Sequence, residues 1–106
     1  MTATTPTRRA LITCADRYMG RAIATKFRQL GIDVIEDDSP LTSNAEVDRV
    51  IAEAGRIDIL VANLAEPPMT GPVDAIDDAD WQRLFARLVD PLMHRVRAVT
   101  PQMLER

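Results

Sequence analysis

The chain has 106 residues, of which 46% are hydrophobic and 4% aromatic, and its formal net charge at pH 7 is −3. This length allows one domain at most, and the composition is typical of a globular α/β protein rather than a disordered chain. The acidic balance excludes the electrostatic argument for nucleic acid or a membrane surface as a partner, and one Cys with one His excludes a dedicated Cys/His metal site.

The first residues give expectations about processing and location. Residues 1–8 are polar and threonine-rich, so we expect a flexible leader there rather than a signal peptide. No stretch of the sequence is long and apolar enough to span a bilayer. A lone Cys fits a reducing compartment, and we therefore expect a cytoplasmic protein.

The next segment predicts a strand, a helix and a second strand. A short apolar run predicts a buried strand over residues 9–14, and apolar residues at helical spacing predict an amphipathic helix over 19–30. Gly31 stands where such a helix ends in the left-handed conformation. Residues 33–36 predict a second strand, and Asp37 belongs to the acidic cluster at its end.

The middle of the chain predicts another helix and strand. Ser43 and Glu46 have the spacing of a capping box, and Gly55 closes the helix that follows. The buried stripe of this helix is expected to be Val47, Val50, Ile51 and Ala54. Residues 57–62 are the most apolar run of the chain and predict a central strand, with a loop over 63–71 behind it.

The last third predicts two helices. Asp77 or Asp78 can cap the first, whose apolar side carries Trp81, Leu84, Phe85 and Leu88. Pro91 cannot sit inside a helix without breaking it, so it predicts the first turn of a second helix over 91–105, which Pro101 should bend. One face of this second helix carries Leu92, Val96, Val99 and Met103.

This order of elements predicts an α/β fold with a Rossmann-like, three-layer parallel sheet and right-handed crossovers. Three strands make a thin sheet, and the apolar face of the 91–105 helix would be bare in a monomer. We therefore expect an incomplete domain that continues beyond Arg106 or is completed by a partner. The 91–105 helix is the expected contact with a second copy or a second chain.

The turn after the first strand is the expected ligand site. In an α/β sheet the first strand ends there, and the next helix presents free N–H groups. A dinucleotide-binding turn carries three glycines because the backbone must approach a pyrophosphate closely. In this chain Cys14 and Tyr18 occupy the first two glycine positions, and only Gly20 remains.

Four segments of the sequence resemble the amino-terminal half of a short-chain dehydrogenase/reductase: residues 10–13, 20–24, 55–61 and 98–103. The resemblance implies that residues 9–106 are the amino-terminal half of a Rossmann-like domain. Within this superfamily, Thr13, Tyr18 and Gly20 match the pattern of the halohydrin dehalogenases. Residues 62–65 and 90–95 look closest to the B-type members.

The halohydrin dehalogenase resemblance implies a lyase that converts a vicinal halohydrin to an epoxide and a halide ion without a dinucleotide. Its Ser–Tyr–Arg group lies in the family's second half, so no catalytic residue is expected in this chain. The resemblance implies a small-molecule substrate, a halide ion as ligand and no metal. The pocket would be formed by Thr13, Tyr18, Asn63, Pro67 and Pro68.

Each pocket residue also has a purely structural interpretation. Thr13 is expected to tie the turn together through its hydroxyl, and Asn63 to satisfy backbone groups between neighbouring strands. Tyr18 forms a wall of an anion pocket or only packs over the following helix. Pro67 and Pro68 line the mouth of the pocket or merely stiffen a loop.

An alternative is the amino-terminal half of an NAD(P)-dependent oxidoreductase. Thr13, Arg17, Gly20, Asp37 and Asn63 would then bind NAD or NADP. Asp37 stands where a ribose-binding acid would lie, although a solvated strand end is the interpretation we favour. Arg17 stands where a basic residue would meet the extra phosphate of NADP, although an exposed arginine is commoner. A third possibility is a non-catalytic truncated or interaction chain.

Overall fold

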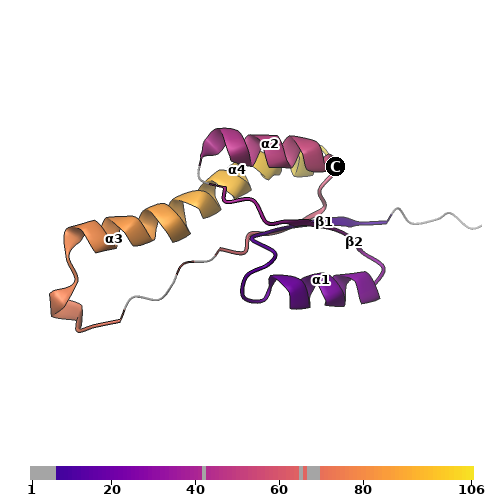
Figure 1. Ribbon diagram of the computed structural model, residues 1–106. Helices are drawn as coiled ribbons and strands as arrows, with labels where there is room; N and C mark the ends of the chain where they lie inside the picture. The colour runs from indigo at the N-terminus through magenta and orange to yellow at the C-terminus, as the bar shows by residue number, and fades with distance from the viewer. Residues whose placement is uncertain (1–6, 42, 65, 67–69) are drawn as a thin grey trace, which may run out of the picture.

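The computed structural model describes most of the chain: residues 7–41, 43–64, 66 and 70–106. Its centre is an open parallel sheet with the strand order β2-β1-β3. The strands are β1 (Arg9–Thr13), β2 (Asp33–Asp37) and β3 (Ile59–Val61). Helices cover both faces of this sheet, so the predicted Rossmann-like α/β fold is confirmed (Figure 1).

The register of the sheet makes β1 its central strand. Leu11 lies opposite Ile35 of β2 on one side and Leu60 of β3 on the other. The prediction that residues 57–62 form the central strand is therefore wrong for the described sheet. β1 hydrogen-bonds on both of its sides, whereas β3 is short, pairs on one side only and is half-buried.

Helix α1 (Gly20–Gln29) covers one face of the sheet, on the side opposite α2 and α4 (Figure 1). Its Ala24 packs against the buried Ile12 of β1. The helix is shorter than predicted: Met19 and Leu30 lie just outside it and are exposed. Only the middle of the predicted apolar stripe reaches the sheet, because the strands beneath it are short.

Helix α2 (Asn44–Ala54) lies on the other face and begins as predicted. The Ser43 hydroxyl accepts a hydrogen bond from the Glu46 N–H at 3.2 Å, and Gly55 ends the helix with φ of +72°. The predicted buried stripe is confirmed: Val47, Val50, Ile51 and Ala54 all belong to the core.

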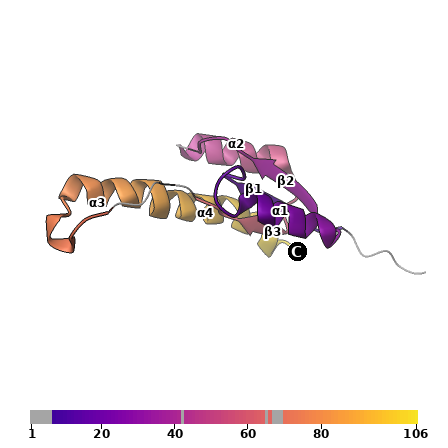
Figure 2. The same cartoon turned by 60° about the horizontal axis from the view of Figure 1, so that its bottom comes forward.

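The last helical segments form one rod that runs out beyond the sheet (Figures 1 and 2). They are α3 (Asp78–Leu84), the π-helical η2 (Phe85–Val89) and α4 (Asp90–Leu104), and a short separate turn, η1 (Val73–Ala75), precedes them. The predicted cap is present, because the Asp77 carboxylate accepts from the Asp80 N–H at 2.7 Å. Within the described part of the chain, none of the helices has the length and apolar character of a membrane span.

Pro91 lies in the first turn of α4, as predicted, but no break separates α4 from α3. A proline in a regular helix clashes with the carbonyl group four residues earlier, which here belongs to Arg87. The wider π turn of η2 contains Arg87 and relieves this clash, so the rod continues. Pro101 lies within α4, which continues to Leu104.

The predicted apolar face of the last helix divides into two parts. Val99 is buried and Met103 packs against the core formed with α2. Leu92 and Val96 are exposed, and so are Trp81 and Phe85, whose ring centroids are 5.2 Å apart. A row of apolar side chains therefore remains uncovered along the rod.

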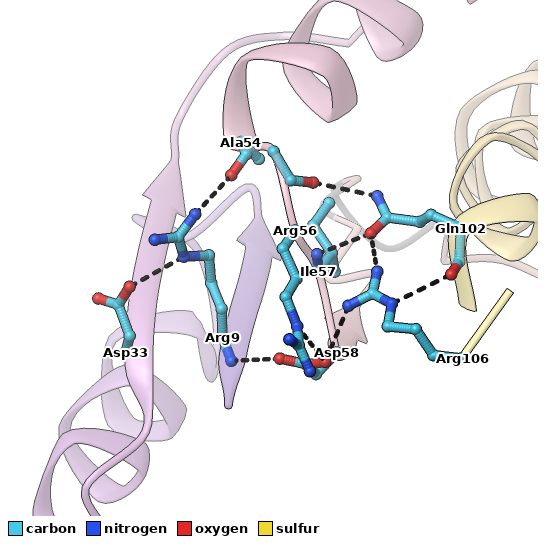
Figure 3. A network of polar contacts seen from close by, with 9 residues as sticks. Arg9, Asp33, Ala54, Arg56, Ile57, Asp58, Gln102 and Arg106 are labelled. Carbon is cyan, nitrogen blue, oxygen red and sulfur yellow. Dashed lines mark hydrogen bonds and ion pairs between the residues drawn. The ribbon is translucent and has the colours of Figure 1, made fainter. Parts of the chain in front are cut away.

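A polar network fastens the end of α4 to the amino ends of the strands (Figure 3). Gln102 accepts from the Ile57 N–H at 2.8 Å, and Arg106 donates to Asp58 at 3.1 Å. Asp58 also accepts from the Arg9 N–H at 2.8 Å. These contacts fix the end of α4 against the sheet and so define which of its side chains face the strands.

Candidate functional site

A cavity of about 760 Å³ lies at the carboxyl ends of the strands, where ligands bind in open α/β sheets. Its walls come from the turn after β1, the segment after β2, the loop after β3 and the rod of η2 and α4. The lining side chains include Cys14, Arg17, Asp38, Leu64, His94 and Arg95. The described residues contain no group of His, Cys, Asp and Glu side chains arranged to hold a metal ion.

The turn after β1 has the left-handed backbone conformation that favours glycine, although other residues stand at two of its glycine positions. Cys14 and Tyr18 have φ of 47° and 49°, in the left-handed region that disfavours residues with a side chain. Asn63 supports this conformation, because its Nδ2 donates to the carbonyl oxygens of Cys14 at 2.9 Å and of Arg17 at 2.7 Å. Asn63 therefore satisfies backbone groups, as expected.

Thr13 and Gly20 complete the turn. The Thr13 hydroxyl donates to the Asn63 carbonyl oxygen at 3.1 Å, so it ties β1 to the end of β3. A Cβ atom on Gly20 would lie 2.4 Å from the carbonyl oxygen of Ala15. Gly20 is thus required for the close approach of α1 to the turn, whatever ligand binds there.

Tyr18 reaches towards the loop after β3, where it contacts Glu66, a residue of the cavity wall. Its hydroxyl donates to the backbone carbonyl of Glu66 at 2.9 Å, while the side chain stays 67% exposed. The Glu66 carboxylate in turn accepts from Arg83 of α3. Tyr18 is not among the side chains that line the cavity in the described structure.

Two residues of the predicted pocket, Pro67 and Pro68, lie outside the described residues. Of the residues expected to bind a dinucleotide, Arg17 lines the cavity, is exposed and lies 3.8 Å from the Asp16 carboxylate. Asp37 ends β2 next to Asp38 of the cavity wall. Its Oδ1 accepts from the Ser39 hydroxyl at 2.9 Å. Its Oδ2 is buried without a hydrogen-bond partner among the described residues.

The sequence interpretation missed Arg95. This side chain of α4 is 2% exposed, and its Nε and Nη1 have no hydrogen-bond partner in the described part of the chain. Burial lowers the pKa of Arg95, and the neighbouring charges of Cys14 and Asp37 oppose that shift. The sequence contained one indication that Arg95 is buried. Arg95 lies four residues before Val99 and therefore on the same, buried side of the helix.

Cys14 lies near Arg95 and is half-buried. Burial raises the pKa of the Cys14 thiol, and the positive charge of Arg95 only partly offsets this effect. The thiol therefore stays protonated near neutral pH and acts as a small side chain in the cavity wall.

The sequence profile of the family described as short chain dehydrogenase matches residues 37–106, which is more than half of the chain. The chain belongs to this family. The match begins at the end of β2, so the altered turn with Cys14 and Tyr18 lies outside it. No curated protein sequence gives a significant match.

Solved structures show the same relationship. A short-chain dehydrogenase/reductase from Burkholderia xenovorans is 27% identical with a TM-score of 0.74, over 92% of this chain and 51% of that one. A short-chain dehydrogenase from Streptomyces avermitilis is 25% identical with a TM-score of 0.84, over 97% of this chain and 47% of that one.

A third structure, ElxO with NADP bound, shares the fold at 14% identity with a TM-score of 0.82, over 94% of this chain and 52% of that one. The chain therefore spans about half the length of the solved relatives that it matches.

Proposed function

We propose that this chain is the dinucleotide-binding half of an NAD(P)-dependent short-chain oxidoreductase. The observation that carries this proposal is Asp37, whose buried Oδ2 lacks a partner at the carboxyl end of β2, beside the cavity. In this fold class an acid at that position accepts hydrogen bonds from ribose hydroxyls. The unpartnered oxygen is better explained by such a role than by a solvated strand end.

The relatives support the same proposal. Two of those described above are named as short-chain dehydrogenases or reductases, and ElxO was solved with NADP. They lend no support to halohydrin dehalogenase activity, so the oxidoreductase alternative replaces it as our main interpretation. For the same reason NAD or NADP replaces the expectation that no cofactor binds.

One observation favours a halohydrin dehalogenase: Tyr18 occupies the second glycine position of the turn. In that interpretation its ring fills the space that a dinucleotide needs. Its hydroxyl is engaged with Glu66, and the side chain does not line the described cavity. The Tyr18 ring is therefore not among the groups that form the walls of the described cavity.

The chain covers about half of its solved relatives, so the activity is a proposal about the whole protein. We propose that residues 9–106 are the amino-terminal half of its Rossmann-like domain. The acid–base residues and most of the substrate pocket would then come from the other half. The substrate class is a small molecule, as is usual in this family.

We further propose that the rod binds a second copy of the chain. Short-chain dehydrogenases are often oligomeric. Trp81, Phe85, Leu92 and Val96 form an exposed apolar row, and uncovered rows of this kind mark interfaces. A Val96→Glu variant that stays dimeric in analytical ultracentrifugation would contradict this assignment.

Equilibrium titration of the full-length protein tests the proposed function. We expect saturable binding of NADH or NADPH and no saturable binding of bromide. Bromide binding without dinucleotide binding would instead support a halohydrin dehalogenase. Binding of neither would support a non-catalytic chain, and either of these two results would overturn the proposal.

A further inference from the structure

Arg95 is a buried cation, and no acidic side chain among the described residues forms an ion pair with it. It is 2% exposed, and two of its nitrogen atoms, Nε and Nη1, lack partners among the described residues. A buried charge without hydrogen bonds is strongly destabilising, and an arginine side chain does not escape this cost by losing its proton. Because Arg95 lies on the buried side of α4, we expect another group to compensate its positive charge.

The nearest candidate within the chain does not supply that group. The charge of Asp37 acts on Arg95, and both residues lie at the carboxyl end of the sheet. Nevertheless, Arg95 forms no ion pair within 4.0 Å in the part of the chain that the structure describes. Asp37 Oδ2 is also buried without a partner. A buried cation and a carboxylate oxygen at the same end of the sheet therefore both have unmet hydrogen-bonding capacity among the described residues.

Both groups belong to the same end of the sheet. Arg95 is part of the cavity wall, together with Cys14 at the end of β1 and Asp38 directly after Asp37. The network around Gln102 fixes the end of α4, so Arg95 is held towards this cavity. The arrangement suits a ligand with an anionic group for Arg95 and hydroxyl donors for Asp37.

We infer that Arg95 anchors a phosphate group of a nucleotide in this cavity, while Asp37 accepts hydrogen bonds from its sugar hydroxyls. The guanidinium fork matches the geometry of phosphate oxygens and forms charge-assisted hydrogen bonds with them. This inference rests on the proposed function when the nucleotide is a dinucleotide, and it adds a positively charged residue from α4 to the site.

The altered turn explains why such an anchor is useful. A glycine-rich turn binds a pyrophosphate through backbone N–H groups that the ligand can approach closely. In this turn Cys14 and Tyr18 carry side chains at two of the glycine positions, although the backbone keeps its left-handed conformation. Arg95 would supply a phosphate-binding group from α4.

The test measures the dissociation constants of ADP, AMP, adenosine and NADH with the full-length protein and with an Arg95→Leu variant. We expect Arg95→Leu to weaken ADP and NADH binding by about 10- to 100-fold. This factor corresponds to the usual contribution of hydrogen bonds to a charged group. Adenosine, which has no phosphate, should bind both proteins equally. Arg97→Gln is the matched control, since Arg97 is exposed on the same helix.

Unfolding by urea separates binding from folding. Replacing an uncompensated buried charge by Leu should leave the stability unchanged or raise it, so weaker binding would not reflect loss of the fold. Equal ADP and NADH affinities in the wild type and Arg95→Leu would overturn the inference and leave the proposed function standing. ADP binding through Arg95 without NADH or NADPH binding would overturn the proposed function and leave the inference standing. A wild type that binds none of these ligands would overturn both.

Discussion

The hydroxyl of Thr13 donates a hydrogen bond to the backbone carbonyl of Asn63, which lies 50 positions further along the chain. The Asn63 side chain returns two hydrogen bonds to the turn that follows Thr13. The two residues thus join the ends of β1 and β3. They hold the turn in a conformation that its own residues disfavour, since Cys14 and Tyr18 both have positive φ.

The first prediction concerns this junction. Asn63→Ala removes the donors to Cys14 and Arg17, and we expect the free energy of unfolding to fall by about 1–3 kcal/mol. Urea unfolding followed by circular dichroism measures the change. Gln29→Ala, at the exposed end of α1, is the control. Equal stabilities of the wild type and Asn63→Ala would show that the turn does not depend on these hydrogen bonds.

The second prediction compares two glycines. Gly20→Ala places a Cβ atom 2.4 Å from a backbone oxygen of Ala15, so α1 must move away from the turn. Gly31→Ala meets no atom within 4 Å but has φ of +77°, and we expect it to cost about 1–2 kcal/mol. Gly20→Ala should be the more destabilising variant in the same urea assay. The opposite order would contradict the packing described for α1.

The third prediction concerns pH and the network at the other end of the sheet. The Arg9 N–H and the neighbouring arginines lower the pKa of Asp58 below its ordinary value of 3.8. Ionised Asp58 therefore stabilises the fold above the ordinary pKa, and this contribution is lost as the pH falls through the lowered pKa.

The measurement for Asp58 is the urea midpoint across pH. Asp58→Asn should be less stable than the wild type near neutral pH, and the difference should shrink as the pH falls below about 4. Asp48→Asn, exposed on α2, should show no such trend. A difference between the wild type and Asp58→Asn that stays constant down to about pH 3 would contradict the lowered pKa.

The fourth prediction concerns the choice between NADH and NADPH. In the proposed function, the Asp37 carboxylate would bind the 2′-hydroxyl of NADH and repel the 2′-phosphate of NADPH. Arg17 is exposed, with Asp16 as its nearest acid, and does not offset this repulsion. We expect NADH to bind at least about tenfold more tightly, and Asp37→Asn to reduce the preference. Tighter binding of NADPH by the wild type would show that Arg17 determines the specificity.

Local patterns in the sequence predicted most of the fold. The capping residues Ser43 and Asp77, the terminating glycines Gly31 and Gly55 and the spacing of apolar residues each act within a few positions. They therefore define where helices begin, end and face the sheet. The order of the strands depends on pairing between distant segments, and for this reason the prediction that residues 57–62 form the central strand was wrong.

The site was less predictable for the same reason. The turn was recognised from neighbouring residues, but the contact of Tyr18 with Glu66 joins segments 48 positions apart. Arg95 was not recognised, because a charged residue on an amphipathic helix usually faces solvent. Only the packing of α4 in the folded chain shows that this charge is buried.

Cys14 provides a direct report on whether a dinucleotide enters the cavity, since it lies in the wall. Its raised pKa predicts slow alkylation near neutral pH and faster alkylation as the pH rises above the ordinary value of 9.0. The decisive measurement is the iodoacetamide rate at Cys14 in the full-length protein, followed by mass spectrometry with and without NADH. We predict that saturating NADH slows this rate at least about tenfold. An unchanged rate would contradict binding of the dinucleotide in this cavity.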